Sequence, residues 1–334
     1  MRFEFFVGLD ISKLTLDFVV RNQDQILFHV QVPNNKKGLR VFEQQCKARQ
    51  VALKQSMICM EHTGIYNSCP LDYFHSKGYA IWLENAIQIK KSMGMVRGKN
   101  DKVDAMRISE YAFRFQDKMC PWKPERNVLT QLRHLSGLRR RFIDAKNQLK
   151  VPMNETKGFH NKSLVRKLEQ LNRKPIQVLE KNIEEVEHQI ALLIRSDARL
   201  NELFEQVCSV AGVGPVLFWE FILTSNEFTS ITDPKKFACY AGVAPFEHSS
   251  GSSIRGKNRV SGMSNKTSKK LLHMAAMSAV AMKGELRDFY QRKVAEGKNK
   301  MSVLNAVRNK IIHRVFACVR ENRKYEKSYT HTLA

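Results

Sequence analysis

Residues 5–33 of this 334-residue chain read FFVGLDISKLTLDFVVRNQDQILFHVQVP, and this stretch decides the fold of the N-terminal part. It divides into three runs rich in β-forming residues, Phe5–Asp10, Leu14–Val20 and Ile26–Val32. The segments between these runs are short enough for hairpins. We therefore predict an antiparallel three-stranded meander at the start of the chain.

The pattern changes after this meander. It predicts a helix over Gly38–Ala48, a strand over Met57–Glu61, a helix over Leu71–Lys77 and a strand over Ala80–Leu83. Strands separated by helices favour parallel crossover connections. Three antiparallel strands followed by βα units is the order of the RNase H-like (RuvC-like) fold, so we predict an α/β domain of this class over residues 1–122.

The strand pattern ends near Arg126, and the remainder is predicted to be helical. A heptad-like apolar stripe runs through Ile176, Leu179, Ile183, Val186, Ile190 and Leu193. It predicts a coiled-coil hairpin or a dimer contact, with packing inside its own domain as the alternative. Pro152 and residues 154–162 are predicted to form the loop before this helix. We expect a basic helical, coiled-coil region over residues 123–200 and a mainly α domain over residues 201–334.

Composition limits the classes of partner. The formal net charge is +24, from 56 Lys and Arg against 32 Asp and Glu, which favours a polyanion such as nucleic acid. The seven cysteines are scattered and form no C-x-x-C pair, which indicates neither a disulfide framework nor a zinc site. No apolar run is long enough to span a bilayer. We expect a cytoplasmic, nucleoid-associated protein without a membrane partner.

Four acidic residues form the first candidate site. Asp10 ends the first predicted strand and Glu61 ends the fourth, while Asp101 and Asp104 begin a predicted helix at i,i+3 spacing. Phosphodiester chemistry uses divalent cations, and Mg²⁺ prefers carboxylate oxygens. Each acid also has an ordinary alternative role: Asp101 as an N-cap, Asp104 as a surface charge and Asp10 as a turn residue. The joint pattern favours a magnesium site.

The second candidate site is a serine-rich segment, Ser249-Ser250-Gly251-Ser252-Ser253, followed by cations without an acid. Those cations are Arg255, Lys257, Arg259, Lys266, Lys269 and Lys270. A serine hydroxyl beside them could attack a phosphodiester. Without a family resemblance, a flexible loop is the better interpretation of this composition.

Gly212 and Gly214 separate two apolar segments, as in the hairpin of a helix-hairpin-helix motif. Backbone N–H groups at such a turn can bind a DNA phosphate, so we predict a nucleic-acid contact here; a tight connection is the alternative.

Several of these segments resemble one family. Gly-Leu-Asp-Ile-Ser-Lys around Asp10, Met-Glu-His-Thr-Gly around Glu61 and Asn-Asp-Lys-Val-Asp-Ala around Asp101 and Asp104 resemble the DEDD motifs of insertion-sequence transposases. That family includes bridge-RNA-guided recombinases and Piv-type DNA invertases. Ala-Gly-Val-Ala-Pro followed by Ser-Ser-Gly-Ser-Ser-Ile-Arg-Gly resembles the signature of its C-terminal transposase domain.

The resemblance implies a transposase or recombinase that exchanges DNA strands through a covalent serine–DNA intermediate. The serine before Gly251 is Ser250, and the neighbouring Ser249 departs from the family pattern. The implied site comprises Asp10, Glu61, Asp101 and Asp104 with Mg²⁺. The implied partners are donor and target double-stranded DNA, a bridge RNA and further copies of the chain, as a dimer or a tetramer in the synaptic complex. A metal-dependent, structure-selective nuclease, like a junction resolvase, is the alternative.

Overall fold

The computed structural model describes residues 3–92, 100–156, 159–250, 254–260, 262 and 264–326. For residues 156, 246–250 and 254–259 it describes the backbone alone. The chain divides into two compact units, Met1–Pro124 and Glu125–Ala334, and each is described by itself. The predicted boundary after residue 122 lies close to this division, whereas the further boundary at residue 200 stays a prediction.

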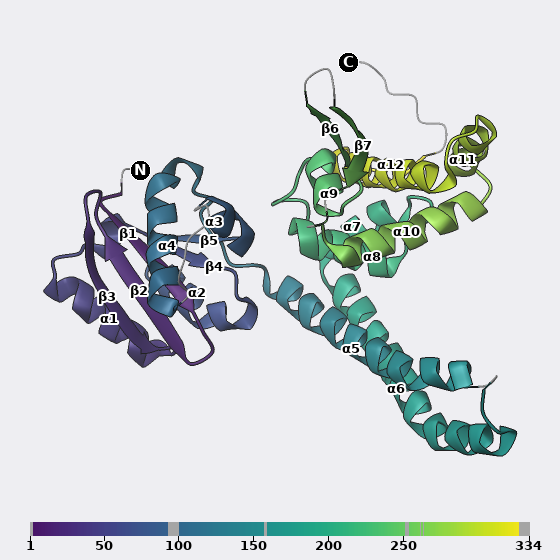
Figure 1. The fold of residues 1–334 in the computed structure, drawn as a ribbon, viewed down its shortest axis with the longest axis horizontal. Coiled ribbons are helices and arrows are strands. Elements are labelled where there is room, and N and C mark those ends of the chain that lie inside the picture. Colours follow the sequence, from purple (N-terminus) through teal and green to yellow (C-terminus); the bar gives the residue numbers. More distant parts are fainter. Residues whose placement is uncertain are drawn as a thin grey trace. The chain divides into compact units, whose positions relative to one another are not determined.

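The first unit is built on a five-stranded sheet (Figure 1). Its strands are β1 (Phe5–Ile11), β2 (Thr15–Arg21), β3 (Ile26–Pro33), β4 (Ser56–Glu61) and β5 (Ala80–Glu84), in the order β3-β2-β1-β4-β5. β2 is antiparallel to β1 and to β3, whereas β4 is parallel to β1 and to β5. The meander and the parallel crossovers are therefore confirmed, and this mixed sheet is compatible with an RNase H-like fold.

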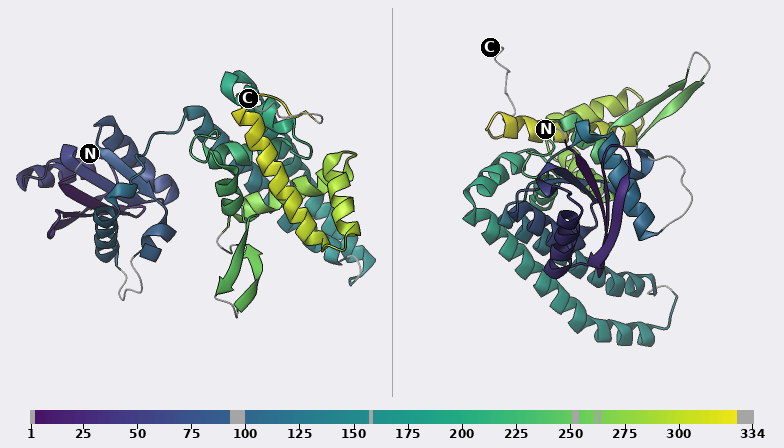
Figure 2. Two further views of the ribbon diagram at one scale, coloured as in Figure 1. Left: turned by 90° about the horizontal axis from the view of Figure 1, so that it is seen from above. Right: turned by 90° about the vertical axis from the view of Figure 1, so that its left-hand side faces the viewer.

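Helices cover both faces of the sheet (Figures 1 and 2). Helices α1 (Lys36–Ala48) and α2 (Ser68–Ser76) pack on the face formed by alternate residues such as Val7 and Leu9. Helices α3 (Ala86–Ser92) and α4 (Asp101–Arg114) pack on the opposite face, which carries Phe6. Because side chains alternate along a strand, Gly8 and Asp10 share the α4 face with Phe6.

The second unit begins with two long helices, α5 (Asn127–Thr156) and α6 (Lys162–Ser196), which pack against each other. Arg139 Nε on α5 lies 2.6 Å from Glu187 Oε1 on α6. Of the predicted apolar stripe, Ile183, Val186 and Ile190 are buried within the chain. The predicted loop is confirmed at residues 159–161, but its predicted start is wrong, because α5 continues through Pro152 to Thr156. A proline weakens one helical turn, but here the helix continues past it.

The remaining helices build a single core together with the bases of α5 and α6. They are α7 (Ala198–Cys208), α8 (Pro215–Ser225), α9 (Pro234–Tyr240), α10 (Lys266–Ala281), α11 (Glu285–Ala295) and α12 (Lys300–Arg320). Residues 201–326 are therefore mainly helical where the structure describes them, as predicted. Among the described residues, no helix has the length and apolar character needed to cross a membrane.

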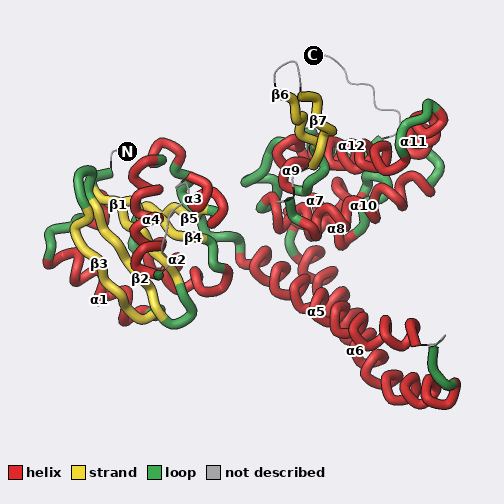
Figure 3. The backbone as a smooth tube through the Cα atoms, viewed as in Figure 1, coloured by secondary structure: helices red, strands yellow, loops and turns green. Residues whose placement is uncertain are grey.

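One strand pair was missed by the sequence-based prediction. Strands β6 (Pro245–Ser250) and β7 (Ile254–Val260) form an antiparallel hairpin in the otherwise helical second unit (Figure 3). The expectation of a flexible loop at Ser249 and Ser250 is therefore wrong for their backbone. The segment is rich in serine and charge, so it lacks the alternating apolar residues from which strands are recognised.

Candidate active site

The sheet topology brings the first two acids together. β1 and β4 are parallel neighbours, with Gly8 opposite Cys59 and Leu9 opposite Met60. Asp10 and Glu61 come next in this register, at the carboxyl ends of both strands. The expectation that the two acids meet at one edge of the sheet is met by the backbone geometry.

Helix α4 supplies the other two acids. Asn100 is its N-cap, and the Asn100 side chain accepts a hydrogen bond from the Val103 N–H at 2.8 Å. The alternative in which Asp101 is the cap is therefore wrong. Asp101 and Asp104 both lie in the first turn, where the helix dipole favours negative charge.

Gly8 allows α4 to lie directly on the strand that carries Asp10. A Cβ atom at Gly8 would lie 2.1 Å from the Ala105 carbonyl oxygen and 2.3 Å from the Ser109 nitrogen. Glycine is therefore required by this close approach of two backbones. The contact fixes the height of α4 above the strand.

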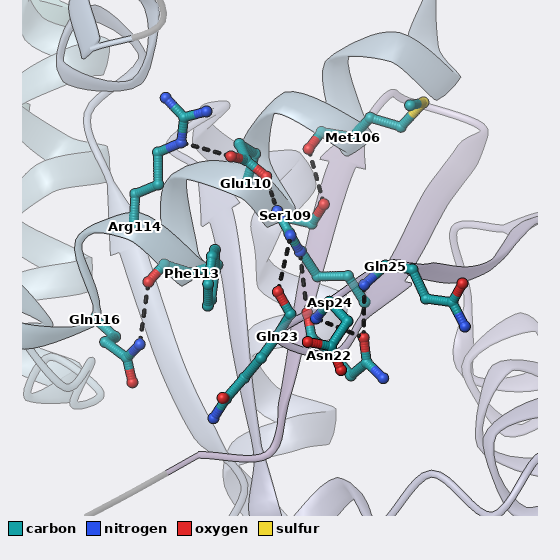
Figure 4. Close-up of polar contacts among 11 residues, drawn as sticks. Asn22, Gln23, Asp24, Gln25, Met106, Ser109, Glu110, Phe113, Arg114 and Gln116 are labelled. Carbon is teal, nitrogen blue, oxygen red and sulfur yellow. Dashed lines mark hydrogen bonds and ion pairs between the residues drawn. The ribbon is translucent and has the colours of Figure 1, made fainter.

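An ion pair fixes the other end of α4. Glu110 on α4 pairs with Arg21, a buried residue at the end of β2. It also pairs with Arg114 on its own helix (Figure 4). The Arg21 guanidinium also stacks over the Phe113 ring at 4.4 Å. These contacts hold the helix in place, so the positions of Asp101 and Asp104 depend on the packing of the whole helix.

The electrostatics show that the four acids act on one another. Burial and, after it, the charges of Asp101, Asp104 and Glu61 together raise the pKa of Asp10 to about 6. The pKa of Glu61 is raised as well, first by burial and then by Asp104. Acids from two strands and one helix therefore form one cluster, in which the ionisation of Asp10 and of Glu61 is disfavoured.

The carboxylate oxygens of the cluster are ligands that a hard divalent cation prefers, but they do not converge on one point. Asp104 Oδ1 accepts a hydrogen bond from Arg107 at 2.7 Å. Within the described ranges, no three Asp, Glu, His or Cys side chains gather closely enough to hold one metal ion. To hold a cation, Asp104 would have to give up its contact with Arg107.

Two further carboxylates on the same sheet face were not identified from the sequence. Glu84 is the register partner of Glu61, and its carboxylate accepts a hydrogen bond from the Tyr111 hydroxyl at 3.1 Å. Asp17 is the register partner of Asp10; it is buried and accepts from His29 at 2.8 Å and Gln31 at 2.9 Å. Glu84 ends an apolar strand, as Glu61 does, and could have been found by that signal. Asp17 lies inside a strand and had no such signal.

Ser250 is the last residue of β6, where its backbone pairs with Ile254 across the hairpin. Ser249 precedes it in the same strand, opposite Arg255. Gly251, Ser252 and Ser253 lie outside the described residues. The nucleophilic role of Ser250 therefore stays a prediction.

The predicted cations lie on two elements that follow the serine. Arg255, Lys257 and Arg259 belong to β7, and the structure describes only the backbone of these three residues. Lys266, Lys269 and Lys270 lie in the first turns of α10, after its N-cap Asn265. Cations at a helix N-terminus oppose the dipole, so an approaching anion would be stabilised by both the dipole and the lysines.

The turn at Gly212 and Gly214 connects α7 to α8. Gly212 has a φ of +86°, and a Cβ atom there would lie 2.3 Å from the Ala275 carbonyl oxygen on α10. Close packing therefore explains this glycine. Gly214 is the N-cap of α8 and has open space around it, next to a cavity of about 480 Å³. The phosphate contact predicted for this turn stays a prediction.

Comparison with known proteins agrees with this architecture. Residues 7–156 match the transposase family model DEDD_Tnp_IS110, and residues 205–291 match the model described as the transposase IS116/IS110/IS902 family. The pilin gene-inverting protein of Moraxella bovis is 24% identical over 332 residues, which cover 96% of this chain and 98% of that protein. The insertion element IS116 uncharacterized 44.8 kDa protein of Streptomyces clavuligerus is 28% identical over 132 residues, 40% of this chain and 33% of its own length.

The sheet with its acidic cluster and the two matched domains define a DNA-processing enzyme of the transposase class, with a domain type that indicates dependence on a divalent metal. Within that class, the chain belongs to the IS110/IS116/IS902 family of transposases.

Proposed function

We propose that the chain exchanges DNA strands through a covalent intermediate at Ser250, assisted by Mg²⁺ held by Asp10, Glu61, Asp101 and Asp104. One observation supports the metal half of this proposal: in addition to burial, the charges of the acids on α4 and of Glu61 on β4 raise the pKa of Asp10 on β1. Family membership supports the other half, because residues 205–291 match a transposase domain that includes the serine hairpin.

The proposed chemistry conserves the number of phosphodiester bonds. The Ser250 hydroxyl oxygen attacks a DNA phosphorus, an Oγ–P bond forms, and the bond from phosphorus to one deoxyribose oxygen breaks. The serine proton passes to a general base, and the departing deoxyribose oxygen takes up a proton. A hydroxyl of another strand then reverses the step, so that the strands are exchanged without an external energy source.

The acidic cluster suits Mg²⁺ in kind, because its ligands are hard oxygens and Mg²⁺ keeps several of its waters. When bound, the ion would polarise phosphoryl oxygens and stabilise charge on the attacking and leaving oxygens. The contribution of the chain is positioning: Gly8 and the Arg21–Glu110 pair hold α4, and α4 holds Asp101 and Asp104.

The basic elements of the second unit would bind the DNA backbone. Lys266, Lys269 and Lys270 lie at the N-terminus of α10, and the backbones of Arg255, Lys257 and Arg259 follow the serine along β7. Together they would bind and stabilise negative charge on phosphate without reading base sequence. We propose the Gly212–Gly214 turn as a further phosphate contact.

We propose donor and target DNA of the nucleoid as substrates, a structured bridge RNA as guide and an oligomer of the chain as the acting species. The Moraxella relatives are named as gene-inverting proteins, and inversion is the reaction that their names suggest for this chain. The charge of +24 is consistent with binding more than one nucleic acid at a time. Sequencing nucleic acid that co-purifies with the protein tests the RNA: finding no enriched structured RNA would remove the guide.

The central experiment compares Ser250→Ala with Ser249→Ala in a recombination assay that also detects protein–DNA adducts on a denaturing gel. We expect Ser250→Ala to abolish both products and Ser249→Ala to retain them. Full DNA cleavage by Ser250→Ala without an adduct would instead favour the metal-dependent nuclease, in which water attacks. That second function needs only the acidic cluster of the first unit.

A further inference from the structure

Arg308, on α12, differs from the other buried charged residues among those described. Four charged residues are buried: Asp17, Arg21, Glu227 and Arg308. Arg21 pairs with Glu110, Glu227 pairs with Arg126, and Asp17 is hydrogen-bonded to His29. Arg308 is 6% exposed and no carboxylate among the described residues contacts it.

The contacts that Arg308 does make are neutral. One terminal nitrogen lies 2.6 Å from His273 Nδ1, which must accept because the guanidinium can only donate. The other terminal nitrogen lies 3.4 Å from Asn305 Oδ1, and the buried Nε has no hydrogen-bond partner. Burial and the charge of Arg308 lower the pKa of His273, so that the pair carries a single positive charge.

An isolated buried cation is costly unless an anion compensates it. The guanidinium has donors to spare, and its planar fork matches the oxygens of a phosphate. His273 and Asn305, whose side chains contact the guanidinium, are half-buried, whereas Arg308 itself is buried.

The location of Arg308 connects it to the serine hairpin. Asn305, one turn earlier on α12, donates a hydrogen bond to the Val243 carbonyl at 2.7 Å. Val243 precedes β6 by two residues. His273 lies on α10, one turn after Lys269 and Lys270, and α10 packs against α12. The unpaired cation is therefore adjacent to the base of the strand that carries Ser250.

We propose that Arg308 and His273 form a binding site for a phosphodiester phosphate of nucleic acid at the base of the β6–β7 hairpin. The site deepens the proposed function, on which it rests for the identity of the phosphate. Its anion chemistry is independent of strand exchange.

Arg308→Met tests the site, and Arg314→Met is the matched control. Arg314 lies on the same helix but pairs with Glu285 at 2.7 Å, so its charge is already compensated. The measurement is thermal unfolding of the full chain in sulfate or inorganic phosphate against chloride at equal ionic strength. We expect the anions to raise the Tm of the wild type by about 3 °C in a saturable way.

In chloride, Arg308→Met should unfold at the same temperature as the wild type or a higher one, because an uncompensated charge has been removed, and it should lose the anion response. Arg314→Met should have a lower Tm and keep the response. A lower Tm for Arg308→Met with the anion response retained would overturn the site, because Arg308 would then be structural. So would a wild type whose Tm shows no saturable response, a result that does not need the variant to fold.

Short single-stranded DNA and RNA of one sequence identify the source of the phosphate. The one that protects the wild type more than Arg308→Met is the ligand, and equal protection of both proteins by both oligonucleotides would contradict the site. Failure of Ser250→Ala to abolish recombination, with the anion response intact, would remove the serine mechanism alone.

Discussion

At the scale of single residues, Asp10 shows how a functional group is destabilised by its surroundings. It lies at the carboxyl end of β1, partly buried, within reach of three other acids. Its pKa of about 6 means that ionising it in the folded protein costs more than in the unfolded chain. This cost is the expected consequence of gathering acids for a cation, and it predicts how stability should depend on pH.

Asp10→Asn should abolish strand exchange and stabilise the protein when no divalent cation is present. An acid whose pKa is raised by folding lowers stability as pH rises from its unfolded pKa of 3.8 towards about 6, and the loss persists above that pH. We therefore expect Asp10→Asn to be more stable than the wild type at pH 8, by about 2 kcal/mol after allowing for solvent screening, and similar at pH 4.

Thermal unfolding in a chelator at both pH values checks this expectation, with Asp24→Asn in the exposed β2–β3 turn as control. Adding Mg²⁺ should raise the Tm of the wild type but not that of Asp10→Asn. A variant that is less stable than the wild type at pH 8 would contradict the mutual repulsion of the acids.

At the scale of elements, α4 is the part of the fold on which the acidic cluster depends. It crosses the sheet at Gly8, pairs through Glu110 with β2 and begins at an asparagine cap. None of these contacts involves the acids themselves. A substitution at one of these contacts can therefore displace the helix while every proposed metal ligand stays unchanged.

Gly8→Ala should move the acids on α4 away from the acids at the ends of β1 and β4. Its methyl group would lie 2.1 Å from a backbone oxygen of α4, so the helix must move, at a cost of about 1–3 kcal/mol. We expect a lower midpoint in denaturant and a strong loss of metal-dependent activity. Gly137→Ala, in an open position on α5, is the control and should be neutral or slightly stabilising. Unchanged activity in Gly8→Ala would show that the position of α4 does not matter.

At the scale of the whole molecule, the dominant property is charge. A net charge of +24 favours association with nucleic acid and makes that association sensitive to salt. The charge is a property of the whole chain, whereas specific phosphate contacts should be confined to a few elements. Salt dependence distinguishes these two contributions.

The logarithm of the affinity for duplex DNA should fall linearly with the logarithm of the salt concentration. Replacing Lys266 and Lys270 by glutamine should reduce the steepness by about 2, if each contacts one phosphate. Replacing the exposed Lys37 and Lys47 of α1 removes the same charge and should leave the slope nearly unchanged. Equal effects of both pairs in a binding titration would mean that only net charge matters.

Local patterns determined much of this protein from the sequence alone. The three N-terminal strands, the βα units and the long helices follow from apolar periodicity, which is a short-range property of the chain. The acids at the strand ends and at the start of α4 could also be found from short stretches of sequence. Where apolar periodicity was weak the prediction failed, as at the β6–β7 hairpin, and where a proline suggested a break, α5 continued through Pro152.

Only the tertiary structure decided which of these groups act on one another. The strand order places Asp10 beside Glu61, and the backbone contact at Gly8 brings in Asp101 and Asp104. Burial and then these three acids raise the pKa of Asp10. The sheet register likewise places Asp17 opposite Asp10 and Glu84 opposite Glu61. The lack of an acidic partner for Arg308 becomes evident only when α10 and α12 are packed together. Electrostatic coupling and burial depend on distances between residues far apart in the chain, and no local pattern carries that information.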